Sequence, residues 1–137
     1  GHGSQHQWAK KKLFETVQVA GLTEQAAPPL VIQLDCLSSG VHLPAGGGYA
    51  CLAEALLLTP GKGASAVVGS VAVTPPKGQT ALGVAMLEAL QTDGATLGDA
   101  FAAAQAALAE SGADPEVKSR MVRHASVSKP RCASSRA

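Results

Sequence analysis

The sequence predicts an α/β domain, because stretches typical of buried strands alternate with stretches typical of helices. Two runs rich in Val, Ile and Ala, at positions 30–35 and 64–73, have the length and composition of buried strands. Between them, Tyr49 to Leu58 is apolar nearly all round, which is typical of a buried helix. Two strands joined by a helix favour a parallel pair with a right-handed crossover. Two strands do not complete a sheet, so we expect further strands from elsewhere.

The first part of the chain predicts little regular structure. Residues 1–9 read as a loop, in which the glycines on either side of His2 permit backbone geometry that a Cβ would forbid. Lys10 to Lys12 is a short basic run, expected in a solvated turn. Residues 13–22 predict an extended piece followed by a short helix, and the two prolines at 28 and 29 lead into the first strand.

Helices dominate the second half. Thr80 to Leu90 has an apolar side typical of a helix, and Thr96 is a suitable N-cap for a further helix through Ala109. Asp114 followed by Pro115 predicts the start of one more short helix. Residues 1–122 therefore form the expected domain portion. Residues 123–137 are polar, basic and without pattern, which predicts a disordered tail.

Composition narrows the function classes. The chain has 137 residues, enough for one domain, with 46% apolar and 15% charged residues and a net charge of +1. This balance gives no electrostatic argument for binding nucleic acid or a membrane surface, and no apolar run is long enough to span a membrane. The three cysteines, at positions 36, 51 and 132, have no Cys-x-x-Cys spacing. We therefore expect neither a zinc ribbon nor a disulfide framework, and no metal or cofactor.

Cys36 is the leading candidate for chemistry, because it follows the first strand where the chain turns at Ser-Ser-Gly. Ligands bind at the carboxyl ends of strands in open α/β sheets. A cysteine peptidase needs a thiolate, an imidazole beside it and donors for the oxyanion. His2 lies far enough before Cys36 for the two to meet at neighbouring strand ends, and the backbone N–H groups of Gly3 and Cys36 are candidate oxyanion donors.

Several alternatives stay open from the residues alone. Cys36 is also compatible with a small buried core residue. His2 is compatible with a vector-derived terminus, or with a zinc site shared with His6 and Cys36. Cys51 fits a core position within the apolar helix. Ser70, at the end of the second strand, fits either the lining of a cleft or an ordinary turn.

The ordered set of motifs resembles the gingipain-type cysteine peptidases of the caspase-like clan. Gly1-His2-Gly3-Ser4 with Trp8-Ala9 is similar to the histidine block of that family, and residues 29–36 are similar to the strand that carries its nucleophile. Further similar blocks follow in the same order, at residues 52–57, 63–70, 81–83 and 96–100. The resemblance covers residues 1–110, and the order of the blocks is more specific than any single one.

The resemblance implies a caspase-like three-layer α/β sandwich with a mainly parallel sheet, present here as a C-terminal fragment. It implies a cysteine endopeptidase with Cys36 as nucleophile and His2 as general base, and with the backbone N–H groups of Gly3 and Cys36 as the oxyanion hole. Trp8 and Ser70 would line the cleft. The implied partners are a peptide or protein substrate and the missing N-terminal half of the domain, and the implied location is the outside or surface of a bacterial cell.

Two departures from the family pattern bear on activity. Against the family pattern, we expect the half of the domain that precedes the histidine to be missing from this sequence, and the residues after Met121 do not resemble the family's final turn and strand. A non-catalytic caspase-like module, serving in binding or structure, is therefore the alternative to a peptidase. A reactive thiol at Cys36 would distinguish the two.

Overall fold

The computed structural model describes residues 2–42, 48–110 and 124–128. Its elements, in chain order, are β1 (Gly3–Ser4), β2 (Gln7–Trp8), β3 (Phe14–Glu15), the 3-10 helix η1 (Thr16–Gly21), β4 (Leu30–Ile32), α1 (Leu52–Leu58), β5 (Ala66–Ser70), α2 (Pro76–Ala89), α3 (Leu97–Glu110) and β6 (His124–Ser128).

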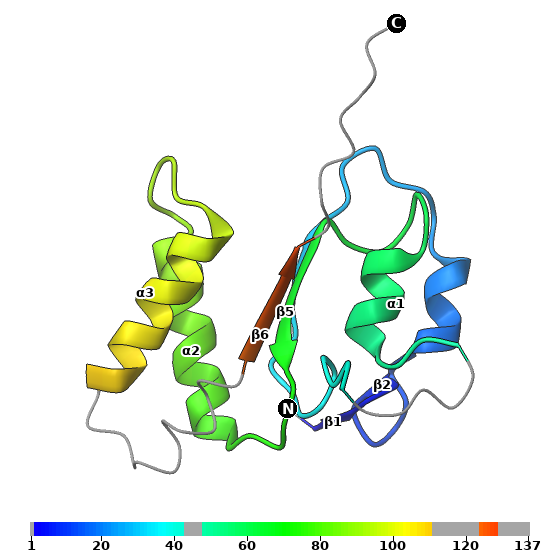
Figure 1. Ribbon diagram of the computed structural model, residues 1–137, viewed down its shortest axis with the longest axis horizontal. Helices are drawn as coiled ribbons and strands as arrows, with labels where there is room; N and C mark the ends of the chain where they lie inside the picture. The colour runs from blue at the N-terminus through cyan, green and yellow to red at the C-terminus, as the bar shows by residue number, and fades with distance from the viewer. Residues whose placement is uncertain (1, 43–47, 111–123, 129–137) are drawn as a thin grey trace, which may run out of the picture.

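The main sheet has the order β4-β5-β6. β4 and β5 are parallel, with Leu30 opposite Ala66, and α1 lies between them in the chain as the predicted crossover helix. β6 is antiparallel to β5. Figure 1 shows α1 on one side of this sheet and the α2–α3 pair on the other. The predicted three-layer α/β sandwich is confirmed, and its described sheet contains one parallel and one antiparallel pair.

The core is divided between the two faces of the sheet. Neighbouring residues of a strand point to opposite faces, and in β5 Val67 packs with Leu52 and Leu56 of α1, whereas Val68 packs with Leu82 and Met86 of α2. Cys51, directly before α1, is fully buried in the first of these clusters, so its predicted core position is confirmed.

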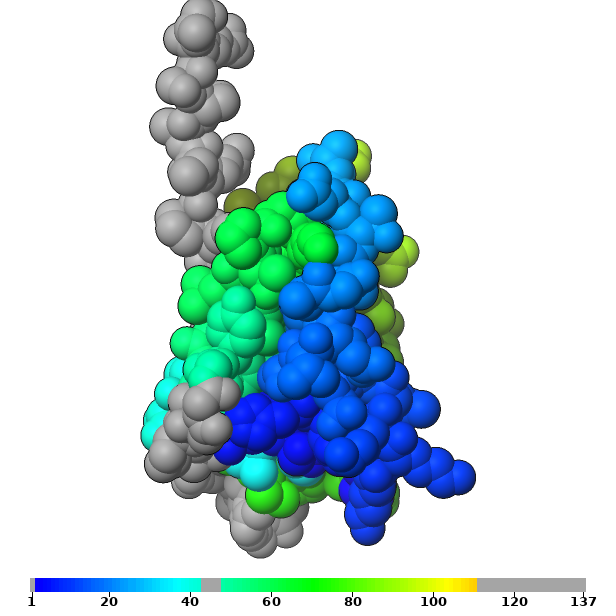
Figure 2. Space-filling model, turned by 90° about the vertical axis from the view of Figure 1, so that its right-hand side faces the viewer, coloured from blue at the N-terminus to red at the C-terminus, as the bar shows by residue number. Residues whose placement is uncertain are grey.

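The prediction of a loop over residues 1–9 is wrong for the two short strands β1 and β2. They form an antiparallel hairpin that continues into β3, with Trp8 opposite Phe14. The rings of Trp8 and Phe14 pack with their centroids 5.1 Å apart, which is a stabilising cross-strand pair. Two-residue strands are too short to show a periodic pattern, so the sequence carried no signal for them. Figure 2 shows these blue N-terminal residues lying against the cyan and green segments of the body.

Other predicted elements are confirmed with shifted ends. β4 and β5 are shorter than the runs that predict them, and α2 begins at Pro76, earlier than Thr80. A proline suits the first turn of a helix, since its missing N–H needs no partner there. α3 follows the predicted N-cap: Thr96 Oγ1 accepts from the Asp99 N–H at 3.2 Å, and the Asp99 carboxylate accepts from the Thr96 N–H.

The last described segment differs from the prediction of a disordered tail, because 124–128 form strand β6 along β5, with Ala66 opposite Ser128. The unpaired edge of β5 explains this, since its N–H and C=O groups gain partners when another strand is added. The predicted short helix after Asp114, Cys132 and the rest of the expected tail lie outside the described residues. No helix of the described part is long and apolar enough to cross a membrane.

Candidate active site

Cys36 stands just beyond β4, at a sharp turn of the backbone. The next residue, Leu37, has a φ angle of 63°, in the left-handed region that side-chain-bearing residues rarely adopt. Its N–H donates to the Ala72 carbonyl at 3.3 Å, and the Ser39 N–H donates to the Ser70 carbonyl at 3.0 Å. These bonds tie the turn to the end of the neighbouring strand β5. Such backbone conformations cost about 1–3 kcal/mol and persist where the surroundings enforce them, often at functional sites.

The half-buried thiol of Cys36 faces the start of α2. Its sulfur lies 3.6 Å from the Thr74 carbonyl oxygen, to which it donates, and 3.9 Å from Gln79 Nε2, from which it accepts. Gln79 Nε2 also donates to Thr74 Oγ1. Sequence analysis did not single out Thr74 and Gln79. The available signal was a polar glutamine one turn after Pro75 and Pro76, at the start of the predicted helix.

Gly3 brings the N-terminal hairpin against the end of β4. A Cβ at this position would overlap the Asp35 carboxylate, so only glycine permits this approach. His2 precedes Gly3 and Cys36 follows Asp35, so each lies one residue, about 3.8 Å of backbone, from this contact. The structure therefore brings the backbones of both predicted catalytic residues to the same end of the sheet.

The side chains of His2 and Cys36 point to different neighbours. The His2 side chain is exposed, while its carbonyl accepts the Ala9 N–H at 2.8 Å. Within the described ranges, the hydrogen bonds of the Cys36 thiol go to Thr74 and Gln79 and not to His2. Catalytic hydrogen bonds often tighten only when substrate is bound.

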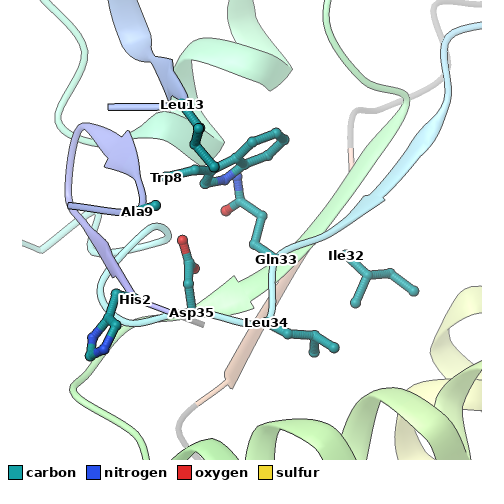
Figure 3. A pocket seen from close by; sticks show the side chains of 8 residues that line it. All are labelled: His2, Trp8, Ala9, Leu13, Ile32, Gln33, Leu34 and Asp35. Atoms are coloured by element: carbon teal, nitrogen blue, oxygen red, sulfur yellow. The ribbon is translucent and has the colours of Figure 1, made fainter. Parts of the chain in front are cut away.

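A pocket of about 320 Å³ adjoins His2. Figure 3 shows Gln33 extending toward Trp8, and the Asp35 carboxylate between His2 and Ala9. The full lining consists of His2, Trp8, Ala9, Leu13, Ile32, Gln33, Leu34 and Asp35. Three of these residues carry buried polar atoms that have no hydrogen-bond partner among the residues that the structure describes, namely Trp8 Nε1, both amide atoms of Gln33 and Asp35 Oδ2. Unpaired buried groups are costly, so this wall is suited to a polar occupant.

Asp35 is the electrostatically unusual group of this wall. Its side chain is 5% exposed, and burial raises the pKa of its carboxyl, an effect partly offset by the hydrogen bond from Ser38 Oγ to Oδ1 at 2.5 Å. Desolvation disfavours the charged form of a carboxyl. Asp35 therefore holds a proton more firmly than an exposed aspartate does.

The remaining predicted site residues are placed as follows. Trp8 lines the pocket with His2. Ser70 is fully buried at the end of β5, where its hydroxyl donates to the Ala72 carbonyl at 2.6 Å. His6 is half-buried. In the part of the chain that the structure describes, no three His, Cys, Asp or Glu side chains are grouped to hold a metal ion.

Comparison with known proteins adds a family and a fold. The sequence model of peptidase family C25 matches residues 1–127. Two solved structures are similar at 21% identity: the Arg-specific cysteine proteinase gingipain R (RgpB), with a TM-score of 0.72, and the complex of the Porphyromonas gingivalis RgpB pro- and mature domains, with a TM-score of 0.76. Each match covers 95% of this chain and 31% of the other, so the chain spans about a third of their length. No curated protein matches the chain.

Proposed function

The chain belongs to peptidase family C25, and on this premise we propose that it is the nucleophile-bearing part of a cysteine endopeptidase. The observation that carries the proposal is the approach of Gly3 to Asp35, because the backbones of His2 and Cys36 adjoin this contact at the end of β4. The left-handed turn at Leu37 adds support, since it holds the nucleophile at a constrained strand end.

In the proposed reaction the Cys36 sulfur attacks the carbonyl carbon of a peptide bond, and His2 takes the thiol proton. The backbone N–H groups of Gly3 and Cys36 donate to the oxyanion that forms. The carbon–nitrogen bond then breaks, and His2 returns the proton to the leaving amine. Water cleaves the resulting thioester and regenerates the thiol. Among the other predicted site residues, Trp8 would line the substrate cleft, and Ser70 would support the strand end behind it.

We assign the activity to a longer polypeptide that includes this chain, because the chain spans 31% of the solved structures that share its fold. The rest of the same domain is the proposed intramolecular partner, and a peptide or protein is the proposed substrate. The polar groups of Trp8, Gln33 and Asp35 that have no partner among the described residues line the pocket beside His2. They support binding of a polar part of either partner there. By the same family relation we propose that the protein acts outside a bacterial cell or on its surface.

The test is the rate at which iodoacetamide alkylates Cys36 as a function of pH, with the label located by peptide mapping. A working pair should give fast labelling of Cys36 below neutral pH, and His2→Ala should abolish this low-pH reactivity. His42→Ala is the matched control, because that histidine is exposed as His2 is. Labelling no faster than that of Cys132, and equal in wild type and His2→Ala, would contradict the proposal.

A non-catalytic module is the second candidate. It is favoured by the direction of the Cys36 thiol, which donates to Thr74 rather than to His2 among the described residues. The same experiment separates the two functions, because a thiol kept only for packing should label slowly and without regard to His2.

A further inference from the structure

The contacts of the Cys36 thiol suggest how it is held between catalytic cycles. Thr74 and Gln79 are 4% and 1% exposed, so the polar groups that meet the sulfur are almost free of competing water. Hydrogen bonds in such surroundings are stronger than in water, and groups that lose them are costly to leave unpaired.

The Gln79 amide nitrogen has two hydrogens, and both have an acceptor here. One is donated to Thr74 Oγ1 and the other is directed at Cys36 Sγ, 3.9 Å away. The Thr74 hydroxyl therefore fixes the amide in the orientation in which it also faces the sulfur. Gln79 lies in the first turn of α2, where its backbone N–H donates to the Pro75 carbonyl at 3.2 Å. A helix that begins with Pro76, directly after Pro75, is a rigid base for such a donor.

The two contacts of the sulfur act in opposite directions on its proton. A neutral thiol can donate to the Thr74 carbonyl, whereas a thiolate cannot. An amide N–H, in contrast, donates more strongly to a charged acceptor than to a neutral one. When the proton leaves, the bond to Thr74 is lost and the bond from Gln79 strengthens.

We propose that Gln79, oriented by Thr74, is a positioning residue that holds the Cys36 sulfur at the end of β4 and stabilises it once it has lost its proton. The Thr74 carbonyl holds the protonated resting form, and Gln79 holds the ionised form. The catalytic meaning of this role rests on the proposed function, since both concern the same nucleophile. The contact itself is independent of His2.

The test compares Gln79→Met with wild type in the pH profile of Cys36 alkylation. Methionine keeps the length and burial of the side chain but has no N–H to donate. We expect alkylation at about pH 6 to slow roughly three- to tenfold, with the rate at high pH unchanged, because the lost bond is one to a charged acceptor. Gln91→Met, an exposed glutamine just beyond the same helix, should leave the profile unchanged.

A purely structural role for Gln79 gives a different result. Loosened packing would expose the thiol and speed its labelling at every pH, and a profile that overlays the wild type or rises uniformly would overturn the proposal. Circular dichroism checks that the variant folds. If Gln79→Met does not fold, Gln79→Asn keeps a buried amide but withdraws it from the sulfur, and the same low-pH slowing is expected.

This result can be told apart from failure of the proposed function. If low-pH alkylation of Cys36 slows in Gln79→Met but is unchanged in His2→Ala, the Gln79 contact is supported and the pairing of His2 with Cys36 is contradicted. The reverse pattern would support the pair and overturn the role of Gln79.

Discussion

At the scale of single residues, Asp35 is the group whose chemistry depends most on its surroundings. It precedes Cys36, lies against Gly3 and accepts a hydrogen bond from Ser38. Within the described part of the chain one of its carboxyl oxygens is buried without a hydrogen-bond partner, and burial raises the pKa of the carboxyl above the ordinary value of 3.8. The carboxyl thus favours the fold when protonated and opposes it when ionised.

We predict that Asp35→Asn removes a pH dependence of stability. Because the folded-state pKa is raised, the contribution of Asp35 to stability is fully present below pH 3.8 and is lost as the pH rises through the raised value. Each unit of upward shift corresponds to about 1.4 kcal/mol. Urea unfolding across this window should therefore show Asp35→Asn gaining stability relative to wild type as the pH rises. Asp93→Asn, at an exposed position, is the control, and parallel curves for wild type and Asp35→Asn would refute the prediction.

At the scale of elements, the decisive contact is between strand β1 and the chain just after β4. It depends on the missing side chain of Gly3, because a Cβ there would overlap three atoms of Asp35. β1 is only two residues long, and the hydrogen bond from the Ala9 N–H to the His2 carbonyl holds His2 within the hairpin. The approach of Gly3 to Asp35 brings that hairpin against the end of β4.

We predict that Gly3→Ala displaces the hairpin from the end of β4. The overlap should cost about 1–3 kcal/mol of unfolding free energy, in the range of overpacked sites. Cys36 alkylation should also lose much of its dependence on His2. Gly21→Ala is the matched control, since nothing lies within 4 Å of a Cβ built there. Unfolding measurements on both variants check this, and equal stability of the two would count against the contact.

At the scale of the whole molecule, the two core clusters depend on a single strand. β5 gives Val67 to the cluster with α1 and Val68 to the cluster with α2 and α3. The loop that follows β5 carries Thr74, and α2 carries Gln79, so the surroundings of the thiol are joined to the second cluster. The residues around the Cys36 thiol are therefore attached to the second cluster, which lies on the opposite face of the sheet from Trp8.

We predict that a cavity in the second cluster unfolds the first as well. Met86 is fully buried, and Met86→Ala should cost about 2–5 kcal/mol. Trp8 fluorescence, which reports the first cluster, should shift to lower denaturant together with the helical circular dichroism signal. Leu87→Ala on the same helix, where the side chain is 53% exposed, should change stability by about 0.5 kcal/mol or less. A Trp8 transition that stays at its wild-type midpoint would show that the clusters unfold separately.

The helices and strands that could be predicted from the sequence are the longer ones with a regular pattern of apolar residues. The helices α1, α2 and α3 and the strands β4 and β5 were all predicted, since each contains a run of mostly apolar residues or a periodic apolar face. The hairpin of β1 and β2 was missed because two-residue strands have no period. β6 was missed because its five residues lie in a largely polar and basic segment, and it is a strand through pairing with β5.

The α/β class, the order of the buried elements and the family can be inferred from the residue types and their order along the chain. The same residues predict His2 and Cys36 as the reactive pair. The groups that surround this pair are set by tertiary packing. The contact of Gly3 with Asp35, and the placing of Thr74 and Gln79 at the Cys36 sulfur, join residues that are distant in the chain. Such contacts depend on how the helices and loops pack around β5, and this packing cannot be inferred from the hydrophobic period of any one segment.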